Sequence, residues 1–293
     1  MIGKWLSKLG AISLSLVSLL PFWLLYVVSD ILFIFLYYIF SYRKAVVREN
    51  LRNAFPEKSE MERLIIERKY FEYLADLAME TIKCISISKK EVQRRMVPTN
   101  PELMQYYFSK GKSIIAAAGH YCNWEMATLS FGFLTDKRRV IVYKTQSNIV
   151  FNDFFNRTRS RFGATMVAMK QALRKMIEHK NELTFTVLVS DQTPASSEVN
   201  YFTMFLNQPT AVFLGIEKLT KVIDCVVIFY RIDYIKRGYY TYTLVPLVEN
   251  PKQTKPYEIT NIHVRYLETL IREKPQYWLW SHRRWKKKPE IAI

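Results

Sequence analysis

One uninterrupted apolar run, residues 114–118 (IIAAA), constrains the fold of this 293-residue chain more than any other feature. The run has the length of a strand and no alternation of polar and apolar residues, so it suits a strand buried on both faces of a parallel sheet. It ends at Gly119, and Asn123 stands where it would cap a helix that begins near Trp124. The stretch therefore predicts a buried strand, a tight turn and a helix.

The predicted turn carries a histidine and a carboxylate at an H-x4-E spacing, His120 and Glu125. On a regular helix, five residues turn through about 500°, so the two side chains would point roughly 140° apart and would not meet. A strand end, a turn and a first helical turn would let them meet, and an open α/β sheet binds its ligands outside the carboxyl ends of its strands. The alternative is a structural histidine without a chemical role.

Such a pair suits proton transfer from an alcohol. A neutral imidazole can take the proton, and a carboxylate bonded to its other ring nitrogen fixes the tautomer and stabilises the imidazolium that forms. Cys122 and Ser113 lie nearby, but neither stands in a motif such as G-x-S-x-G. The sequence favours direct attack by a substrate hydroxyl over a covalent enzyme intermediate.

The first 44 residues predict a membrane anchor. Between Lys8 and Arg43 the only charged residue is Asp30, and residues 11–40 are rich in large apolar and aromatic side chains. This stretch exceeds a signal-peptide core of about 7–15 residues, and about 20 apolar residues can span a bilayer. We expect either one spanning helix followed by an interfacial helix or a monotopic pair. The alternative is a buried core helix of a soluble protein.

The charges predict an anionic partner and a cytoplasmic location for residues 45–293. A larger cationic cluster follows the apolar stretch than precedes it, and positive loops favour the cytoplasmic side. The net charge of +17 would attract nucleic acid, anionic lipid or an acidic protein. Three widely spaced cysteines without a C-x-x-C imply neither a disulfide framework nor a zinc site, and no metal or cofactor is expected.

The rest of the chain alternates strand-like and helix-like segments. A capping box at Ser59 and Glu62 opens a long helix that reaches about Lys83. Strands are predicted over 139–144, 164–168 and 183–190, helices over 152–161, 170–180 and 211–222, and an antiparallel hairpin over 225–235 and 239–248. This order predicts an α/β fold with a mainly parallel central sheet flanked by helices.

Further site candidates follow the predicted strands. Asp191 and Gln192 come directly after the strand over 183–190. Arg157 and Arg159 alternate near the end of a predicted helix, and guanidinium groups suit phosphate recognition.

The C-terminal run 277–289 (YWLWSHRRWKKKP) interleaves tryptophans with cations that include Arg283 and Arg284. This composition is typical of a single-stranded nucleic-acid site or of a membrane interface. A solvated tail is the alternative.

Together these motifs give the chain a resemblance to the bacterial lipid A biosynthesis acyltransferases, the lauroyl and myristoyl transferases of the lysophospholipid acyltransferase superfamily. The resemblance covers nearly the whole length. The motifs that carry it are the apolar N-terminus, an RxNLxxxFP string from Arg48 to Pro56, the H-x4-E box, the R-x-R at 157–159, Asp191 and the run WLWSHRRWKKKP.

The resemblance implies a glycerolphosphate acyltransferase-like fold in an inner-membrane enzyme, anchored by residues 1–44, with an acyltransferase domain over 45–293 on the cytoplasmic face. Such an enzyme moves a fatty acyl group from an acyl carrier protein thioester to a hydroxyl of a lipid A precursor. His120 would be the general base and Glu125 would orient it. The implied substrate-binding residues are Arg157, Arg159, Asp191, Gln192, Arg283 and Arg284, and neither a metal nor a cofactor takes part.

Three other functions stay open. In the family an acidic or aromatic residue often follows the strand-end aspartate, whereas this chain has Gln192, Thr193 and Pro194 there. In one alternative, therefore, the acceptor is another glycolipid or an amino-acid lipid. A thioesterase could use the same histidine to activate water. A membrane-tethered nucleic-acid binder would use the charge but leave His120 and Glu125 without a purpose, so nucleic acid is not expected as a partner.

Overall fold

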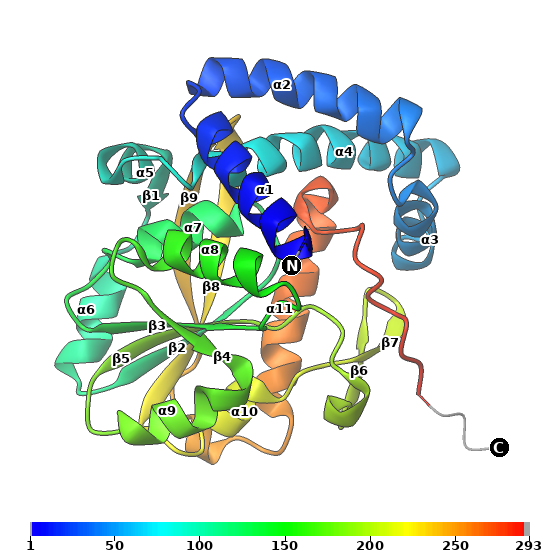
Figure 1. Ribbon diagram of the computed structural model, residues 1–293. Helices are drawn as coiled ribbons and strands as arrows, with labels where there is room; N and C mark the ends of the chain where they lie inside the picture. Colours follow the sequence, from blue (N-terminus) through cyan, green and yellow to red (C-terminus); the bar gives the residue numbers. More distant parts are fainter. Residues whose placement is uncertain (1, 290–293) are drawn as a thin grey trace.

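The fold is built on a seven-stranded sheet in the order β1-β9-β8-β2-β5-β3-β4, beside a separate two-stranded hairpin β6-β7 (Figure 1). The structure is a computed structural model, and it describes residues 2–289. The strands are β1 (Met96–Pro98), β2 (Ser113–Ala118), β3 (Arg138–Tyr143), β4 (Thr165–Ala168), β5 (Thr184–Val189), β6 (Phe202–Phe205), β7 (Gln208–Ala211), β8 (Cys225–Lys236) and β9 (Tyr239–Val248).

Helices lie on both faces of this sheet and across its upper end in Figure 1. The α-helices are α1 (Ile2–Ser18), α2 (Phe22–Ile34), α3 (Lys44–Ala54), α4 (Glu60–Lys83), α5 (Lys89–Arg95), α6 (Glu102–Ser109), α7 (Trp124–Phe131), α8 (Ile149–Ser160), α9 (Ala172–Glu178), α10 (Gly215–Leu219) and α11 (Glu258–Glu273). Shorter elements are the π-helix η1 (Phe35–Ile39) and the 3-10 turns η2 (Met169–Gln171), η3 (Ser196–Glu198), η4 (Pro251–Gln253) and η5 (Pro275–Tyr277).

The central strand is β2, as the apolar run predicts. All six of its residues are buried, and β5 and β8 pair with it in parallel on either side. Strands β3 and β4 extend the parallel part of the sheet, whereas β9 pairs with β8 in antiparallel orientation. The predicted α/β fold with a mainly parallel sheet is confirmed.

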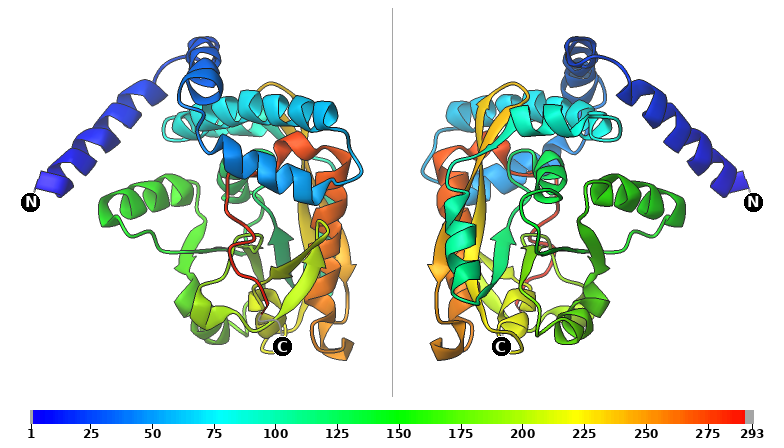
Figure 2. Two further views of the ribbon diagram at one scale, coloured as in Figure 1. Left: turned by 90° about the vertical axis from the view of Figure 1, so that its right-hand side faces the viewer. Right: turned by 90° about the vertical axis from the view of Figure 1, so that its left-hand side faces the viewer.

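The helices form two layers around the sheet. Helices α7 and α8 contact each other on one face, and α10 contacts both α9 and α11 on the other. Figure 2 shows α8 and α11 on opposite sides of the molecule. Because β2 and β5 are neighbouring parallel strands, their carboxyl ends lie side by side at one edge of the sheet.

The predicted helix over residues 211–222 is wrong in its first half. Residues 208–211 form strand β7, which pairs with β6, and the helix is limited to Gly215–Leu219. Leu206 and Asn207 both have positive φ angles, of 50° and 61°, and connect the two strands as a tight turn. Of the predicted helix, Ala211 ends strand β7, and the backbone N–H of Val212 donates to the carbonyl of Tyr201 just before β6. Pairing with the neighbouring strand takes the place of helical hydrogen bonds here, so the helix begins only at Gly215.

The N-terminal elements α1, α2 and η1 are helical, as expected of the anchor. In the described part of the chain, one helical stretch, Phe22–Ile39, is long and apolar enough to cross a membrane, and little of it is buried. It lies along the long helix α4, which begins with the predicted capping box at Ser59 and Glu62 (Figure 1). The division into an anchor over 1–44 and a domain over 45–293 stays a prediction.

At the C-terminal end of α7, position 132 requires a glycine, because the backbone segment before β4 passes close to it. A Cβ atom there would lie 2.8 Å from the carbonyl oxygen of Phe162. We expect Gly132→Ala to lower the free energy of unfolding by about 1–3 kcal/mol, because two backbone segments would have to move apart. Urea unfolding in detergent measures this change.

Gly3→Ala is the matched control. No atom lies within 4 Å of the Cβ that it adds on α1, so the substitution should be neutral or slightly stabilising. Equal stability of the Gly132→Ala variant and the unmodified protein would contradict the packing described here.

Candidate active site

The turn after β2 brings His120 out of the sheet. Cys122 adopts a left-handed conformation, with a φ of 53°, which bends the chain between the strand and α7. Asn123 caps the helix, since its Oδ1 accepts a hydrogen bond from the backbone N–H of Met126 at 2.8 Å. The strand, turn and helix cap that the sequence predicts are all present.

His120 pairs with Asp191, which stands at the end of the neighbouring strand β5. In the sheet register Ala118 lies opposite Val189. His120 lies two residues after Ala118 and Asp191 lies two residues after Val189, so His120 and Asp191 leave the two strands at the same level. The Nδ1 atom of His120 lies 2.6 Å from Oδ1 of Asp191, and the backbone N–H of His120 donates to Oδ2 at 2.8 Å. The carboxylate thus fixes both the ring and the backbone of the histidine.

Asp191 is a buried carboxylate that stays ionised. Burial alone would raise its pKa, but the nearby His120 charge and hydrogen bonds from His120 and Trp278 outweigh burial and lower the pKa to about 2. The indole Nε1–H of Trp278 donates to Oδ2 at 2.8 Å. An ionised carboxylate only accepts hydrogen bonds, so Nδ1 of His120 carries the proton and donates to Oδ1.

In the neutral imidazole, a proton on Nδ1 leaves a lone pair on the other ring nitrogen, Nε2. The side-chain amide of Gln192 lies 3.2 Å from this Nε2 atom and donates to it. Trp124 packs edge-on against the ring, with the centroids 5.1 Å apart. His120, Trp124 and Gln192 line a pocket of about 290 Å³, so the basic nitrogen faces a space that a substrate can enter.

Glu125 does not orient His120, and this expectation is corrected by the structure. Nε of Arg159 donates to Oε2 of Glu125 at 2.9 Å, and Nη2 donates to the other carboxylate oxygen. Burial would raise the pKa of Glu125, but the Arg159 charge holds it below its usual value. Glu125 lies in the first turn of α7, on the side that faces α8, whereas His120 projects from the turn before it. The role assigned to Glu125 belongs to Asp191.

Glu125 and Arg159 nevertheless line the same pocket as His120. The other three predicted arginines do not. Arg157 and Arg283 are exposed, and Arg284 is buried behind Asp191 beside a smaller cavity. Burial lowers the pKa of Arg284 to about 10, against the opposing charge of Asp191. Contact of these three residues with a substrate stays a prediction.

The C-terminal run is part of the site rather than a free tail. Trp278 and Trp280 are buried, and the indole N–H of Trp285 donates to Thr210. His282 accepts the backbone N–H of Thr193, two residues after the strand-end aspartate, at 3.2 Å, and burial lowers the pKa of His282 to about 4. Trp278 and His282 therefore hold the turn that contains Asp191.

Sequence reasoning missed the structural role of Trp278 and the presence of Lys144 in the pocket wall. The aromatic run around Trp278 was a visible signal, but its partner lies 87 residues away. Lys144 directly follows β3, so it stands at another strand end beside the same pocket. The rule that strand ends carry chemistry would have found it.

Glu80, a buried residue of α4, holds the histidine turn from behind. Its Oε2 atom accepts hydrogen bonds from Nδ2 of Asn123 at 2.6 Å and from the hydroxyl of Tyr240 at 2.8 Å. Its Oε1 atom accepts one from the hydroxyl of Tyr26 on α2 at 3.0 Å. The helix cap that follows His120 is thereby tied to α2, α4 and β9.

Among residues 2–289, no group of three His, Cys, Asp or Glu side chains gathers closely enough to hold a metal ion. The three cysteines are free and buried. The polar groups that line the pocket include the imidazole of His120, the Gln192 amide, the cation Lys144 and the ion pair of Glu125 with Arg159.

Two comparisons with known proteins show what the chain is similar to. The family model described as bacterial lipid A biosynthesis acyltransferase matches residues 1–287. The chain is also similar to a protein of Haemophilus influenzae named lipid A biosynthesis acyltransferase, at 23% identity over 284 residues, which cover 95% of this chain and 86% of that protein.

Glu80 should make the stability of the protein depend on pH. Burial raises its pKa to about 7, against the hydrogen bonds that it accepts. Between about pH 4.5 and 7 the Glu80 carboxyl is ionised in the unfolded chain but protonated in the folded chain. The free energy of unfolding therefore falls as the pH rises through this window. In Glu80→Gln this fall should be smaller by a few kcal/mol, which urea unfolding at stepped pH would measure. A pH-independent difference between the two proteins would contradict this assignment.

Asp191→Asn should lower kcat by about 10²–10⁴-fold, because the amide neither fixes the Nδ1–H tautomer of His120 nor stabilises the imidazolium. The variant should keep its fold, since Asn has nearly the shape of Asp. Steady-state kinetics, with circular dichroism as the check on folding, measures the effect.

A double-mutant cycle tests the other carboxylate. Glu125→Gln and Arg159→Gln should each lower kcat/KM, and the double variant should be no worse than the poorer single variant, because each change breaks the same ion pair. Losses in kcat/KM that multiply in the double variant would show that Glu125 and Arg159 act independently. An unchanged kcat in Asp191→Asn would show that Asp191 is not the carboxylate on which His120 depends.

Proposed function

This chain belongs to the bacterial lipid A biosynthesis acyltransferase family, and on that premise we propose that it moves a fatty acyl group from an acyl carrier protein thioester to a hydroxyl of a lipid A precursor. The observation that carries the proposal is the lone pair on Nε2 of His120, held toward a pocket by the buried, ionised Asp191. We further propose that the enzyme acts at the cytoplasmic face of the inner membrane, with its basic surface toward anionic lipid.

The reaction needs one base and no enzyme nucleophile. The acceptor hydroxyl takes the place of the Gln192 amide at Nε2 of His120 and gives up its proton as its oxygen attacks the thioester carbonyl. Asp191 stabilises the imidazolium through the Nδ1–H bond. When the tetrahedral intermediate collapses, the C–S bond breaks, the new ester remains, and the imidazolium returns the proton to the departing thiolate.

The charges around the pocket suit both proposed substrates. Lys144 and Arg159 line it, and either cation can attract the phosphate of a glycolipid or of a carrier prosthetic group. The net charge of +17 would also speed the encounter with an acidic carrier protein.

An apolar pocket beside the histidine suits the acyl chain. It measures about 250 Å³, lies between α9 and α10, and shares Val142, Met169, Val189 and Phe213 with the pocket that contains His120. Burial of each methylene of an acyl chain stabilises the bound state by about 0.8 kcal/mol. An acyl chain that passes from one pocket into the other would therefore be held with its carbonyl near His120.

His120→Ala should remove most turnover and leave membrane association unchanged, because the imidazole is the proposed base and lies outside the N-terminal helices. The assay offers acyl carrier protein thioester to the purified enzyme with and without a lipid A precursor and measures ester and free acid. His179→Ala is the matched control: this histidine pairs with Glu182 at the end of α9, outside the site, and its loss should change nothing.

The same assay separates the alternatives. A transferase releases little free acid without acceptor, whereas a thioesterase releases it at the full rate. Near-normal acyl transfer by His120→Ala would rule out the proposed base. Transfer only to a different glycolipid or to an amino-acid lipid would keep the chemistry and change the acceptor.

A further inference from the structure

We propose that α1 and α2 insert into a single leaflet of an anionic membrane as a monotopic pair, with both ends of the α2–η1 stretch held on one side by the catalytic domain. The inference rests on the membrane location in the proposed function and adds how the chain meets the bilayer. Length alone allows the opposite arrangement, because the 18 residues from Phe22 to Ile39 rise about 27 Å as a helix, close to the thickness of a hydrocarbon core.

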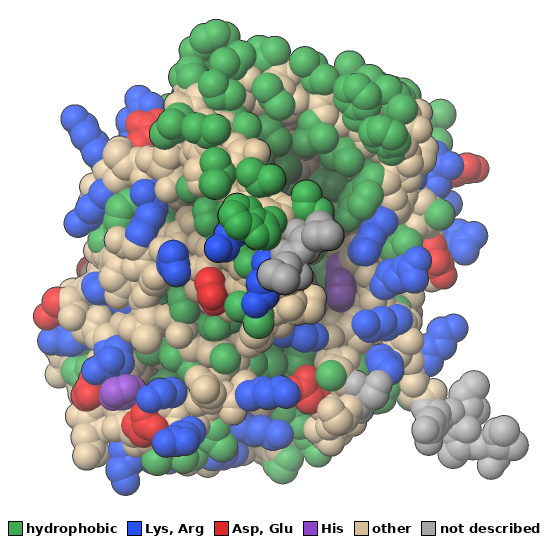
Figure 3. All heavy atoms as spheres, viewed as in Figure 1, with side chains coloured by type: hydrophobic (Ala, Val, Ile, Leu, Met, Phe, Trp, Pro, Cys, Tyr) green, Lys and Arg blue, Asp and Glu red, His purple; other side chains and the backbone are tan. Residues whose placement is uncertain are grey.

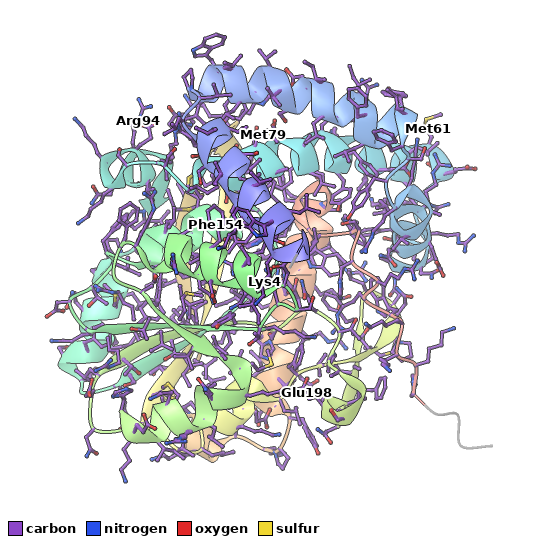
Figure 4. The ribbon with its side chains drawn as sticks, in the orientation of Figure 1. Lys4, Met61, Met79, Arg94, Phe154 and Glu198 are labelled. Carbon is purple, nitrogen blue, oxygen red and sulfur yellow. The ribbon has the colours of Figure 1, made fainter. Side chains whose placement is uncertain are left out.

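The outward faces of both helices are apolar. Exposed side chains recur every three or four residues along each helix, and Trp5 and Trp23 are each 68% exposed. Figure 3 shows hydrophobic side chains gathered over this end of the molecule, and Figure 4 shows side chains of α2 pointing away from α4 along its length. The members of this apolar surface on which the argument depends are Trp5, Leu9, Leu16, Trp23, Val27 and Ile31.

The inward faces carry three buried small polar residues, Ser7 and Ser18 on α1 and Ser29 on α2, and α2 also buries Leu25. Helix α2 is therefore apolar on both sides, whereas a helix on a water-exposed surface turns a polar side outward. It is the arrangement expected where the outer solvent is lipid rather than water.

Both ends of the stretch from α2 through η1 are tied to the same domain. The Lys83 ammonium on α4 donates to the backbone carbonyls of Ser18 and Leu20, just before α2, at 2.9 and 2.8 Å. After η1, the Arg43 guanidinium donates to the carbonyl of Ser281 at 3.0 Å. A spanning helix would place these two ends on opposite sides of the membrane, where one domain cannot bind both.

The middle of this stretch is tied down as well. Asp30 lies near its centre and pairs with Arg237 of the β8–β9 turn at 2.5 Å. Ser29 donates to Asp76 of α4 at 2.6 Å, and Arg237 also pairs with Asp76. Spanning would pull α2 off α4 and leave the Asp30 carboxylate unpaired at the bilayer centre, where a charge is costly.

Helix α1 lies on the same side. The Asn148 amide, at the start of α8, donates to the hydroxyl of Ser7 at 2.9 Å. Lys4 and Lys8 are exposed on α1, and Arg43 and Lys44 follow η1, so cations flank the apolar surface at both ends. Anionic headgroups complement these charges, and Trp5 and Trp23 suit the depth at which indoles collect in membranes.

Depth-dependent quenching tests the placement without any substrate. Variants of the full chain that each carry one introduced cysteine, Trp23→Cys, Val27→Cys, Ile31→Cys or Ile34→Cys, are labelled with an environment-sensitive fluorophore and bound to vesicles that contain phosphatidylglycerol. Lipids with a nitroxide near the headgroup or deep in the acyl chain then quench the probe. The three native cysteines are buried, so labelling of the folded protein is confined to the introduced thiol.

A helix lying in one leaflet should show the same ratio of shallow to deep quenching at all four sites, within about twofold. A spanning helix would instead change depth by about 12 Å between residues 23 and 31, because each residue rises 1.5 Å. Met204→Cys, an exposed apolar position on β6, is the matched control and should not be quenched.

Equal depth at the four sites, with no quenching at residue 204, supports the proposal. A depth that changes regularly from residue 23 to residue 31, no quenching at any of the four sites, or equal quenching at residue 204 would overturn it. The readout does not depend on catalysis, so His120→Ala should give the same depths. If acyl transfer fails in the unmodified protein while the depths hold, the proposed function alone is lost.

Discussion

The structure of the site depends on one contact, the pairing of His120 with Asp191 across the ends of two neighbouring parallel strands. A buried carboxylate is costly unless it is paired and hydrogen-bonded. Here it accepts bonds from the imidazole, from the His120 backbone and from the Trp278 indole, which together keep it ionised. The same bonds decide the tautomer of His120 and direct its lone pair into the pocket. A single set of contacts thus satisfies a buried charge and orients the imidazole of His120.

The surrounding elements hold the two strand ends in place. The segment after α11 contributes Trp278 to Asp191 and His282 to the loop that follows it. From the other side, Glu80 binds the Asn123 cap of α7. Residues from the start, middle and end of the chain therefore meet around a turn of a few residues. This convergence explains why Trp278, Trp280 and Arg284 of the C-terminal run are buried although its composition suggests a free tail.

The polar interior and the apolar exterior of the N-terminal helices follow from the same requirement that polar groups be paired. Glu80 accepts a hydrogen bond from Tyr26 of α2 as well as from the cap beside the site, so the helices proposed to enter the membrane and the catalytic turn share a buried carboxyl. Ser7 and Ser29 on the inner faces find partners in the protein, and the exposed Asp30 is paired with Arg237. An enzyme built this way can keep its active site close to the lipid surface.

The sequence by itself determined the features that depend on neighbours along the chain: the strand at 114–118, the cap at Asn123, the capping box at Ser59 and the apolar N-terminus. It also placed His120 and Asp191 at strand ends, because apolar runs reveal where buried strands stop. Which carboxylate meets the histidine was decided only by the tertiary structure. The H-x4-E spacing suggested Glu125, but β5 enters the sheet between β2 and β3, and its register sets Asp191 beside the ring. The helix expected over 211–222 was only partly correct, because Ala211 pairs with Phe202 in the separate β6-β7 hairpin, and the spacing of the apolar residues does not encode that pairing.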